Sequence, residues 1–124
     1  MRPERHPLGG ACLDNYNCAL AHAVCYGLQH FEHVEREYLH GDLVAYGALV
    51  QLAVDGQLDK ARELRAFLVS LGTPVTLAQM RVPLEKTALH DALIEATTGP
   101  DMAHIPYPVT QDMVFDAMRR VETL

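Results

Sequence analysis

Apolar side chains recur along this chain at intervals of three and four residues, the spacing that places them on one face of an α-helix. No long segment shows the two-residue alternation of a β-strand. The pattern therefore predicts an all-α fold, a compact array of about five helices. The predicted helices cover residues of about 15–31, 43–54, 57–71, 84–97 and 111–122, with a short helical turn over 76–80.

The predicted helices differ in how much of their surface is apolar. Residues 43–54 are apolar on almost every side, which is typical of a buried helix, and Gly47 indicates that a neighbouring helix approaches closely there. Asp55-Gly56 and Gly72 are expected to end helices, Thr110 is expected to cap the last one, and residues 32–39 are expected to form a charged link. The apolar faces expected in the core are Leu20, Ala21, Val24, Leu28 and Phe31; Leu58, Ala61, Leu64, Leu68 and Leu71; and Val114, Ala117, Met118 and Val121.

The composition agrees with one domain over residues 1–124, of which 1–10 are expected to form an irregular lead-in. Apolar residues make up 49% of the chain, enough for a real core, and the net charge of −6 without a basic stripe argues against nucleic-acid binding. No run approaches the roughly 18 apolar residues that cross a membrane. Three cysteines cannot all pair within the chain, so we expect reduced thiols and a cytoplasmic location.

Histidines are the main candidates for chemistry. His22 lies between two alanines of the first predicted helix, and His40 precedes the most apolar helix. Each is either a structural side chain, the commoner role, or a metal ligand, and two such residues on packed helices could share one ion. Catalytic zinc usually takes three protein ligands, so this pair alone does not make a tight site. His30 and His33 are also spaced to share an ion, but their charged surroundings favour a solvated helix end.

A second candidate is a pocket around His22 that uses this histidine as a general base. Cys25 could serve there as a soft ligand or nucleophile, although a small core residue is the more usual role on an apolar helix. The glycine motifs of dinucleotide sites and phosphate loops do not occur, so no cofactor-binding residue is assigned. The residues expected to line this pocket are Asp14, Asn15, Tyr16, Asn17, Cys18 and Cys25.

Two motifs eighteen residues apart carry a family resemblance. The first reads Ala19-Leu-Ala-His22-Ala-Val-Cys-Tyr-Gly-Leu28, and the second reads His40-Gly-Asp-Leu-Val-Ala-Tyr-Gly-Ala-Leu-Val-Gln-Leu52. The later text Leu71-Gly-Thr-Pro-Val-Thr-Leu-Ala78 and Ile105-Pro-Tyr-Pro-Val-Thr-Gln-Asp-Met-Val114 agrees with them. From about residue 10 to its end, the chain resembles the C-terminal part of the helical domain of iron-containing alcohol dehydrogenases, in the glycerol dehydrogenase branch.

The resemblance implies roles for particular residues. It places His22 and His40 at the family's two metal-binding histidines, with zinc as the usual metal of this branch, and it makes Asp42 a structural residue at a helix start. The helix that carries the family's third ligand, an aspartate, and the nucleotide-binding α/β domain have no counterpart here. Around the site, residues 12–18 replace a glycine-rich stretch, and Cys25 stands where many members carry another histidine.

These features predict a partial metal-binding domain, related to NAD-dependent polyol oxidation but inactive alone. NAD would bind only with a partner that supplies the nucleotide domain. The alternatives are a small enzyme that uses the His22 pocket and a non-catalytic helical interaction module that forms homo-oligomers or binds a partner chain. Met1 and the dissimilar lead-in favour a natural short chain over a fragment of a longer dehydrogenase.

Overall fold

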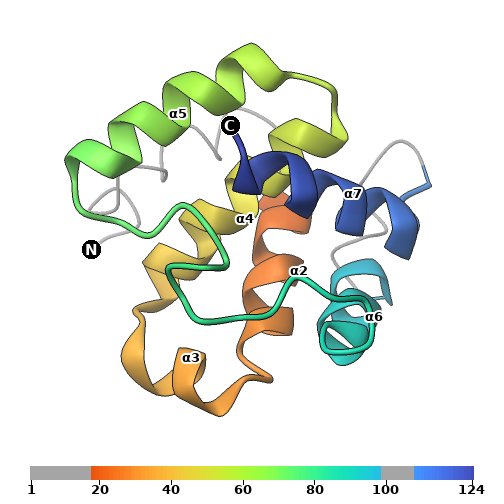
Figure 1. Ribbon diagram of the computed structural model, residues 1–124. Coiled ribbons are helices and arrows are strands. Elements are labelled where there is room, and N and C mark those ends of the chain that lie inside the picture. The colour runs from red at the N-terminus through yellow and green to blue at the C-terminus, as the bar shows by residue number, and fades with distance from the viewer. Residues whose placement is uncertain (1–17, 99–107) are drawn as a thin grey trace.

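The described part of the chain, residues 18–98 and 108–124 of a computed structural model, forms six α-helices and no β-strand (Figure 1). This arrangement confirms the predicted all-α class. The predicted lead-in at 1–10 and the expected helix start near residue 15 lie outside the described residues. The helices are α2 (Cys18–Leu28), α3 (Glu32–Glu37), α4 (His40–Val54), α5 (Leu58–Ser70), α6 (His90–Thr98) and α7 (Gln111–Glu122).

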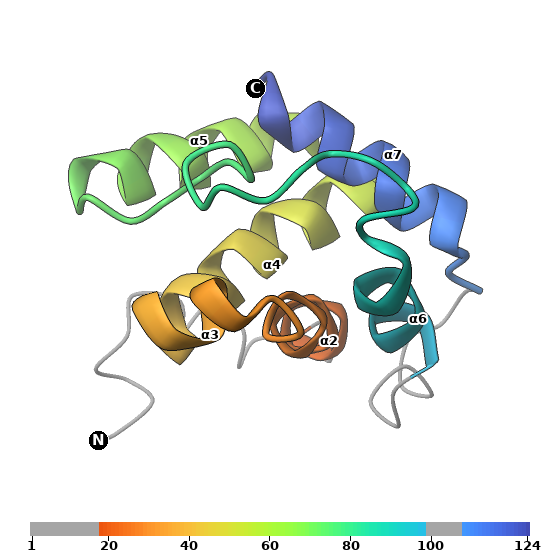
Figure 2. The same ribbon diagram turned by 60° about the horizontal axis from the view of Figure 1, so that its bottom comes forward.

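Helix α4 lies at the centre of the molecule and contacts α2, α5 and α7. Figure 2 shows α2 nearly end-on, with α6 on one side and α4 crossing between α2 and the layer of α5 and α7. Nine of the fifteen residues of α4 are buried, which confirms the prediction that this helix is enclosed on most sides. The buried positions are Leu43, Val44, Ala45, Tyr46, Gly47, Leu49, Val50, Gln51 and Ala53.

Two glycines let α2 pack tightly against both of its neighbours. A Cβ atom added at Gly47 of α4 would lie 2.3 Å from the carbonyl oxygen of Ala21. On the other side, a Cβ added at Gly27 would lie 2.6 Å from the carbonyl oxygen of Ala92 in α6. The backbone of α2 therefore contacts the backbones of α4 and α6, which confirms the close approach expected at Gly47.

Gln51 is the buried polar side chain at the α2–α4 contact. Its Oε1 accepts a hydrogen bond of 3.1 Å from the backbone N–H of Ala21 in α2. A buried polar atom left without a partner costs about 1–3 kcal/mol, so this bond satisfies the Gln51 oxygen and links α2 to α4 at a defined position.

The predicted helix ends are formed by backbone geometry. At the end of α4, Gly56 has a φ of 76° and the N–H of Gln57 donates to the carbonyl of Leu52. The same pattern ends α5, where Gly72 has a φ of 77°. At the start of α7, the Thr110 side chain accepts from the N–H of Met113, as expected for a cap.

Two predictions around the start of α4 were wrong. Residues 32–39 are not simply a link, because residues 32–37 form α3, where Val34 is fully buried and Glu32 pairs with Arg36 at 2.9 Å. Helix α4 starts at His40 rather than at residue 43. Asp42 consequently lies in its first turn, where a carboxylate interacts favourably with the helix dipole.

Two further boundaries differ between 71 and 90. Residues 76–80 form turns rather than a helix, and the carboxylate of Glu122 accepts from the N–H groups of Leu77 and Ala78 there. Helix α6 starts at His90 instead of 84, and residues 86–89 before it form turns. In this segment, Lys86 forms an ion pair of 2.6 Å with Asp112 of α7.

The expected core faces are largely buried. The α2 and α7 positions lie in the core, and Phe31, Leu58 and Leu64 pack against it while partly exposed. Leu71 is the exception, because it follows the last residue of α5 and is 50% exposed. None of the described helices is long and apolar enough to cross a membrane.

Replacing Gly47 with leucine should destabilise the fold. Removing a mid-helix glycine gains roughly 0.5–1 kcal/mol of helix stability, but the new side chain would overlap backbone atoms that cannot rotate away. We expect Gly47→Leu to lower the free energy of unfolding by about 1–3 kcal/mol, measured by urea denaturation. Ala66→Leu on the exposed side of α5 is the matched control, and equal stability of the two variants would contradict the packing described here.

Replacing Tyr46 with phenylalanine should stabilise the protein. Tyr46 is fully buried, and its hydroxyl has no hydrogen-bond partner among the described residues. Burial, and secondarily the charge of Glu122, raise the pKa of this phenol, so the hydroxyl stays protonated. Because an unpaired buried polar group costs about 1–3 kcal/mol, Tyr46→Phe should raise the melting temperature.

The control for this prediction is Tyr38→Phe, which removes a hydroxyl that donates to the carbonyl of Gln79 at 3.2 Å. That variant should not gain stability. A Tyr46→Phe protein that melts below the parent would show that the Tyr46 hydroxyl is hydrogen-bonded in solution.

Candidate functional site

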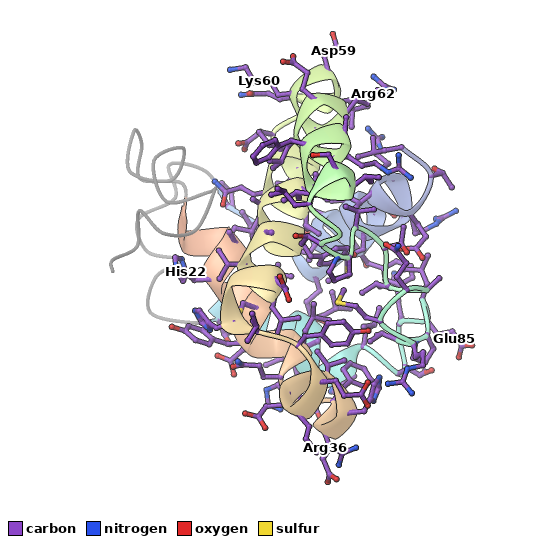
Figure 3. All side chains as sticks on the ribbon, turned by 90° about the vertical axis from the view of Figure 1, so that its left-hand side faces the viewer. His22, Arg36, Asp59, Lys60, Arg62 and Glu85 are labelled. Carbon is purple, nitrogen blue, oxygen red and sulfur yellow. The ribbon has the colours of Figure 1, made fainter. Side chains whose placement is uncertain are left out.

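The packing of α2 against α4 brings His22 and His40 together. His22 follows Ala21, the residue that contacts Gly47, and His40 is the first residue of α4. Their ring centroids lie 6.1 Å apart, with 40° between the ring planes. His22 is partly buried, whereas His40 is exposed, and Figure 3 shows His22 on the opposite side of the molecule from Glu85. The two histidines singled out from the sequence therefore form one local site near the surface.

The structure brings the two rings close together, and their predicted role as ligands of one shared metal ion stays a prediction. Over residues 18–98 and 108–124, no group of three or more histidine, cysteine or acidic side chains is arranged to hold an ion. Catalytic zinc usually takes three protein ligands, so at most two of them could come from the described residues.

Cys25 contacts His40 and is fully buried. Its Sγ lies 3.4 Å from Nδ1 of His40 and 3.8 Å from the carbonyl oxygen of the same residue. Burial raises the pKa of the Cys25 thiol to about 12. The protonated thiol is not the thiolate that nucleophiles and metal ligands require, so Cys25 has the environment of a structural cysteine.

Tyr26 completes the site and was not among the predicted residues. Its ring centroid lies 5.9 Å from that of His40 and 6.5 Å from that of His22, so the three rings form a triangle. Tyr26 is 44% exposed and forms one edge of the site. Its position four residues after His22 places both on one helix face, a signal that the sequence already contained.

Other predicted pocket residues cannot be placed. Asp14, Asn15, Tyr16 and Asn17 lie outside the described residues, and the side chain of Cys18 does too, although its backbone begins α2. Their proposed role as the lining of a His22 pocket stays a prediction.

The remaining described histidines lie apart from this pair and have other surroundings. Nε2 of His30 lies 3.3 Å from a carboxylate oxygen of Glu95, and Nε2 of His33 donates to the carbonyl of Met80 at 2.9 Å. His30 and His33 therefore connect the α2–α3 region to different segments. His90 lines a surface hollow of about 420 Å³ between the starts of α6 and α7.

Comparison with known proteins identifies the segment. No protein-family model matches the chain. Hydroxycarboxylate dehydrogenase A of Escherichia coli is 36% identical over 107 residues, which cover 85% of this chain and 29% of that protein. Glycerol dehydrogenase of Pseudomonas putida and glycolaldehyde reductase of Halobacterium salinarum are each 31% identical over 114 residues, covering 90% of this chain and 31% of theirs. Over this segment, the chain is similar to glycerol dehydrogenases and to related dehydrogenases and reductases.

This similarity confirms the resemblance that the two histidine motifs indicated. The chain spans only about 29–31% of the length of these three relatives. It therefore corresponds to a partial domain of a dehydrogenase, and the activities named for the relatives are those of much longer proteins.

Proposed function

We propose that this chain is a partial glycerol-dehydrogenase-like domain that contributes His22 and His40 to a zinc site and does not oxidise alcohols alone. The observation that carries the proposal is the approach of the two rings to 6.1 Å. The two histidines come from different helices, and the packing of those helices rests on contacts of backbone with backbone. The pairing is thus part of the fold's framework.

In such a site, each part of the chain has a defined task. A zinc ion bound there would polarise the hydroxyl of an alcohol substrate and stabilise the alkoxide. His22 and His40 would hold that ion, and the Tyr26 ring lies close to both histidine rings. A third ligand would come from residues outside those described or from a separate chain. The nucleotide-binding unit would come from the same sources, and it is needed because hydride transfer requires a nicotinamide held against the substrate.

The alternative is a non-catalytic interaction module. Phe67, Val69 and Leu71 at the end of α5 are each between 47% and 53% exposed. Exposed apolar side chains can contribute to self-association, which is the specific support for this alternative. The native mass and the metal content of the purified chain distinguish the two proposals. A tight, metal-free oligomer favours the interaction module, and a stoichiometric metal favours the zinc site.

Metal binding should depend on both histidines. We expect the protein to bind zinc, measured by calorimetry, and His22→Ala and His40→Ala each to weaken zinc affinity at least tenfold, since each removes one direct ligand. His90→Ala is the matched control, because His90 is exposed and lines a separate hollow. Zinc binding that survives intact in both site variants would refute the proposed ligand pair.

The isolated chain should not reduce NAD in the presence of glycerol. The described residues contain no β-strand, and the sequence has no glycine-rich dinucleotide motif, so we expect no nucleotide-binding site. With zinc supplied, NADH absorbance should stay flat, and adding a separately expressed nucleotide-binding domain tests rescue. A protein-dependent rise that disappears in His22→Ala would overturn the expectation of inactivity.

A further inference from the structure

Residues 75–82, called the strap below, belong to the core although they form no helix. Their backbone consists of bends, turns and irregular structure, and the segment between α5 and α6 to which they belong crosses over α4 (Figures 1 and 2). A buried backbone outside a helix must find its hydrogen bonds elsewhere. The buried side chains of the strap are Val75, Leu77, Met80 and Val82.

Every backbone N–H group of the strap has a partner. Six of the eight donate to acceptors within the strap, which are the side chains of Thr76 and Gln79 and two backbone carbonyls. The other two, from Leu77 and Ala78, each donate at 2.9 Å to a different oxygen of the Glu122 carboxylate. Glu122 is the last residue of α7, so the strap completes its own hydrogen bonds only where α7 meets it.

The carbonyl groups of the strap are bonded to a different part of the fold. Nε2 of His33 in α3 donates to the Met80 carbonyl at 2.9 Å. The hydroxyl of Tyr38, which directly follows α3, donates to the Gln79 carbonyl at 3.2 Å. The strap is therefore a hydrogen-bonded connection between α3 and the end of α7.

We infer that the strap is a conformational latch that opens as one unit and that the Glu122 carboxylate locks it closed. A carboxylate has two accepting oxygens, and both are used here, so an amide of the same shape cannot satisfy both N–H groups. Hydrogen bonds to a charged acceptor are also stronger than those between neutral groups.

Opening of the latch would reach the segment that leads into α4. It would release the bonds of His33 and Tyr38, and Tyr38 lies just before the N-cap of α4, Leu39. The strap would thus couple the end of α7 to the start of α4 through a two-state element, which is the physical requirement for coupling between distant segments. This inference goes beyond the proposed zinc site and does not depend on metal binding.

Hydrogen exchange of single amides in the native protein tests the latch. In the parent, the strap amides should exchange through an opening that depends less on urea than the exchange of Leu49 in the buried helix α4, because a local opening exposes less surface than global unfolding. In Glu122→Gln, the amides of Leu77 and Ala78 should exchange about 10–100-fold faster. Met80, whose N–H does not contact Glu122, should accelerate with them if the strap opens as a unit.

Three further variants separate the latch from a general loss of stability. Asp116→Asn makes the same charge change on α7, where Asp116 faces Arg119, and should leave strap exchange unchanged. Gly47→Leu should lower global stability through the α2 contact without speeding exchange in the strap. Tyr38→Phe removes a bond at the α3 side and should accelerate the Leu77 amide by about 2–10-fold.

Three results would overturn the inference. The first is exchange of the strap amides with the same rate and urea dependence as Leu49, which would mean that the strap opens only when the whole fold does. The second is unchanged exchange in Glu122→Gln, and the third is unchanged exchange of Leu77 in Tyr38→Phe. None of these variants alters His22 or His40, so failure of the zinc proposal would leave the test of the latch intact.

Discussion

The close contact between the backbones of α2 and α4 is the constraint on which the rest of this structure depends. At Gly47, the absence of a side chain lets the backbone of α4 contact the backbone of α2 at Ala21. Gln51, one turn later in α4, accepts from the N–H of Ala21 and prevents α2 from sliding along that contact. Because a backbone cannot change rotamer, this packing tolerates little variation and places His22 beside the start of α4, where His40 lies.

The same contact organises one part of the candidate site, whereas the described residues do not supply the rest of a metal site. His40, Cys25 and Tyr26 are connected by ring and sulfur contacts within the α2–α4 unit, so this half is organised by the fold itself. No third ionisable ligand joins them from the described residues. The chain matches less than a third of the length of the relatives hydroxycarboxylate dehydrogenase A and Pseudomonas putida glycerol dehydrogenase.

Two features of the described residues leave side chains in unfavourable surroundings. The Tyr46 hydroxyl is enclosed in the core with no described partner, and the apolar end of α5 is left open to solvent. The first lowers the stability of the core locally, whereas the second leaves apolar side chains in contact with water. Neither feature lies at the His22–His40 pair, so the site and the surface can be altered separately.

The sequence by itself determined the helical class, the enclosed character of residues 43–54 and the Thr110 cap, because these follow from side-chain periodicity and local hydrogen bonding. It also identified His22 and His40 through their flanking motifs. Only the tertiary structure placed the start of α6 at His90, which the helical pattern of residues 84–97 did not determine. It alone revealed Tyr26 and the contact of Cys25 with His40, because these depend on two helices packing at a fixed offset. Periodicity specifies which face of a helix is apolar, but the residue that it meets on another helix is set by the packing of both.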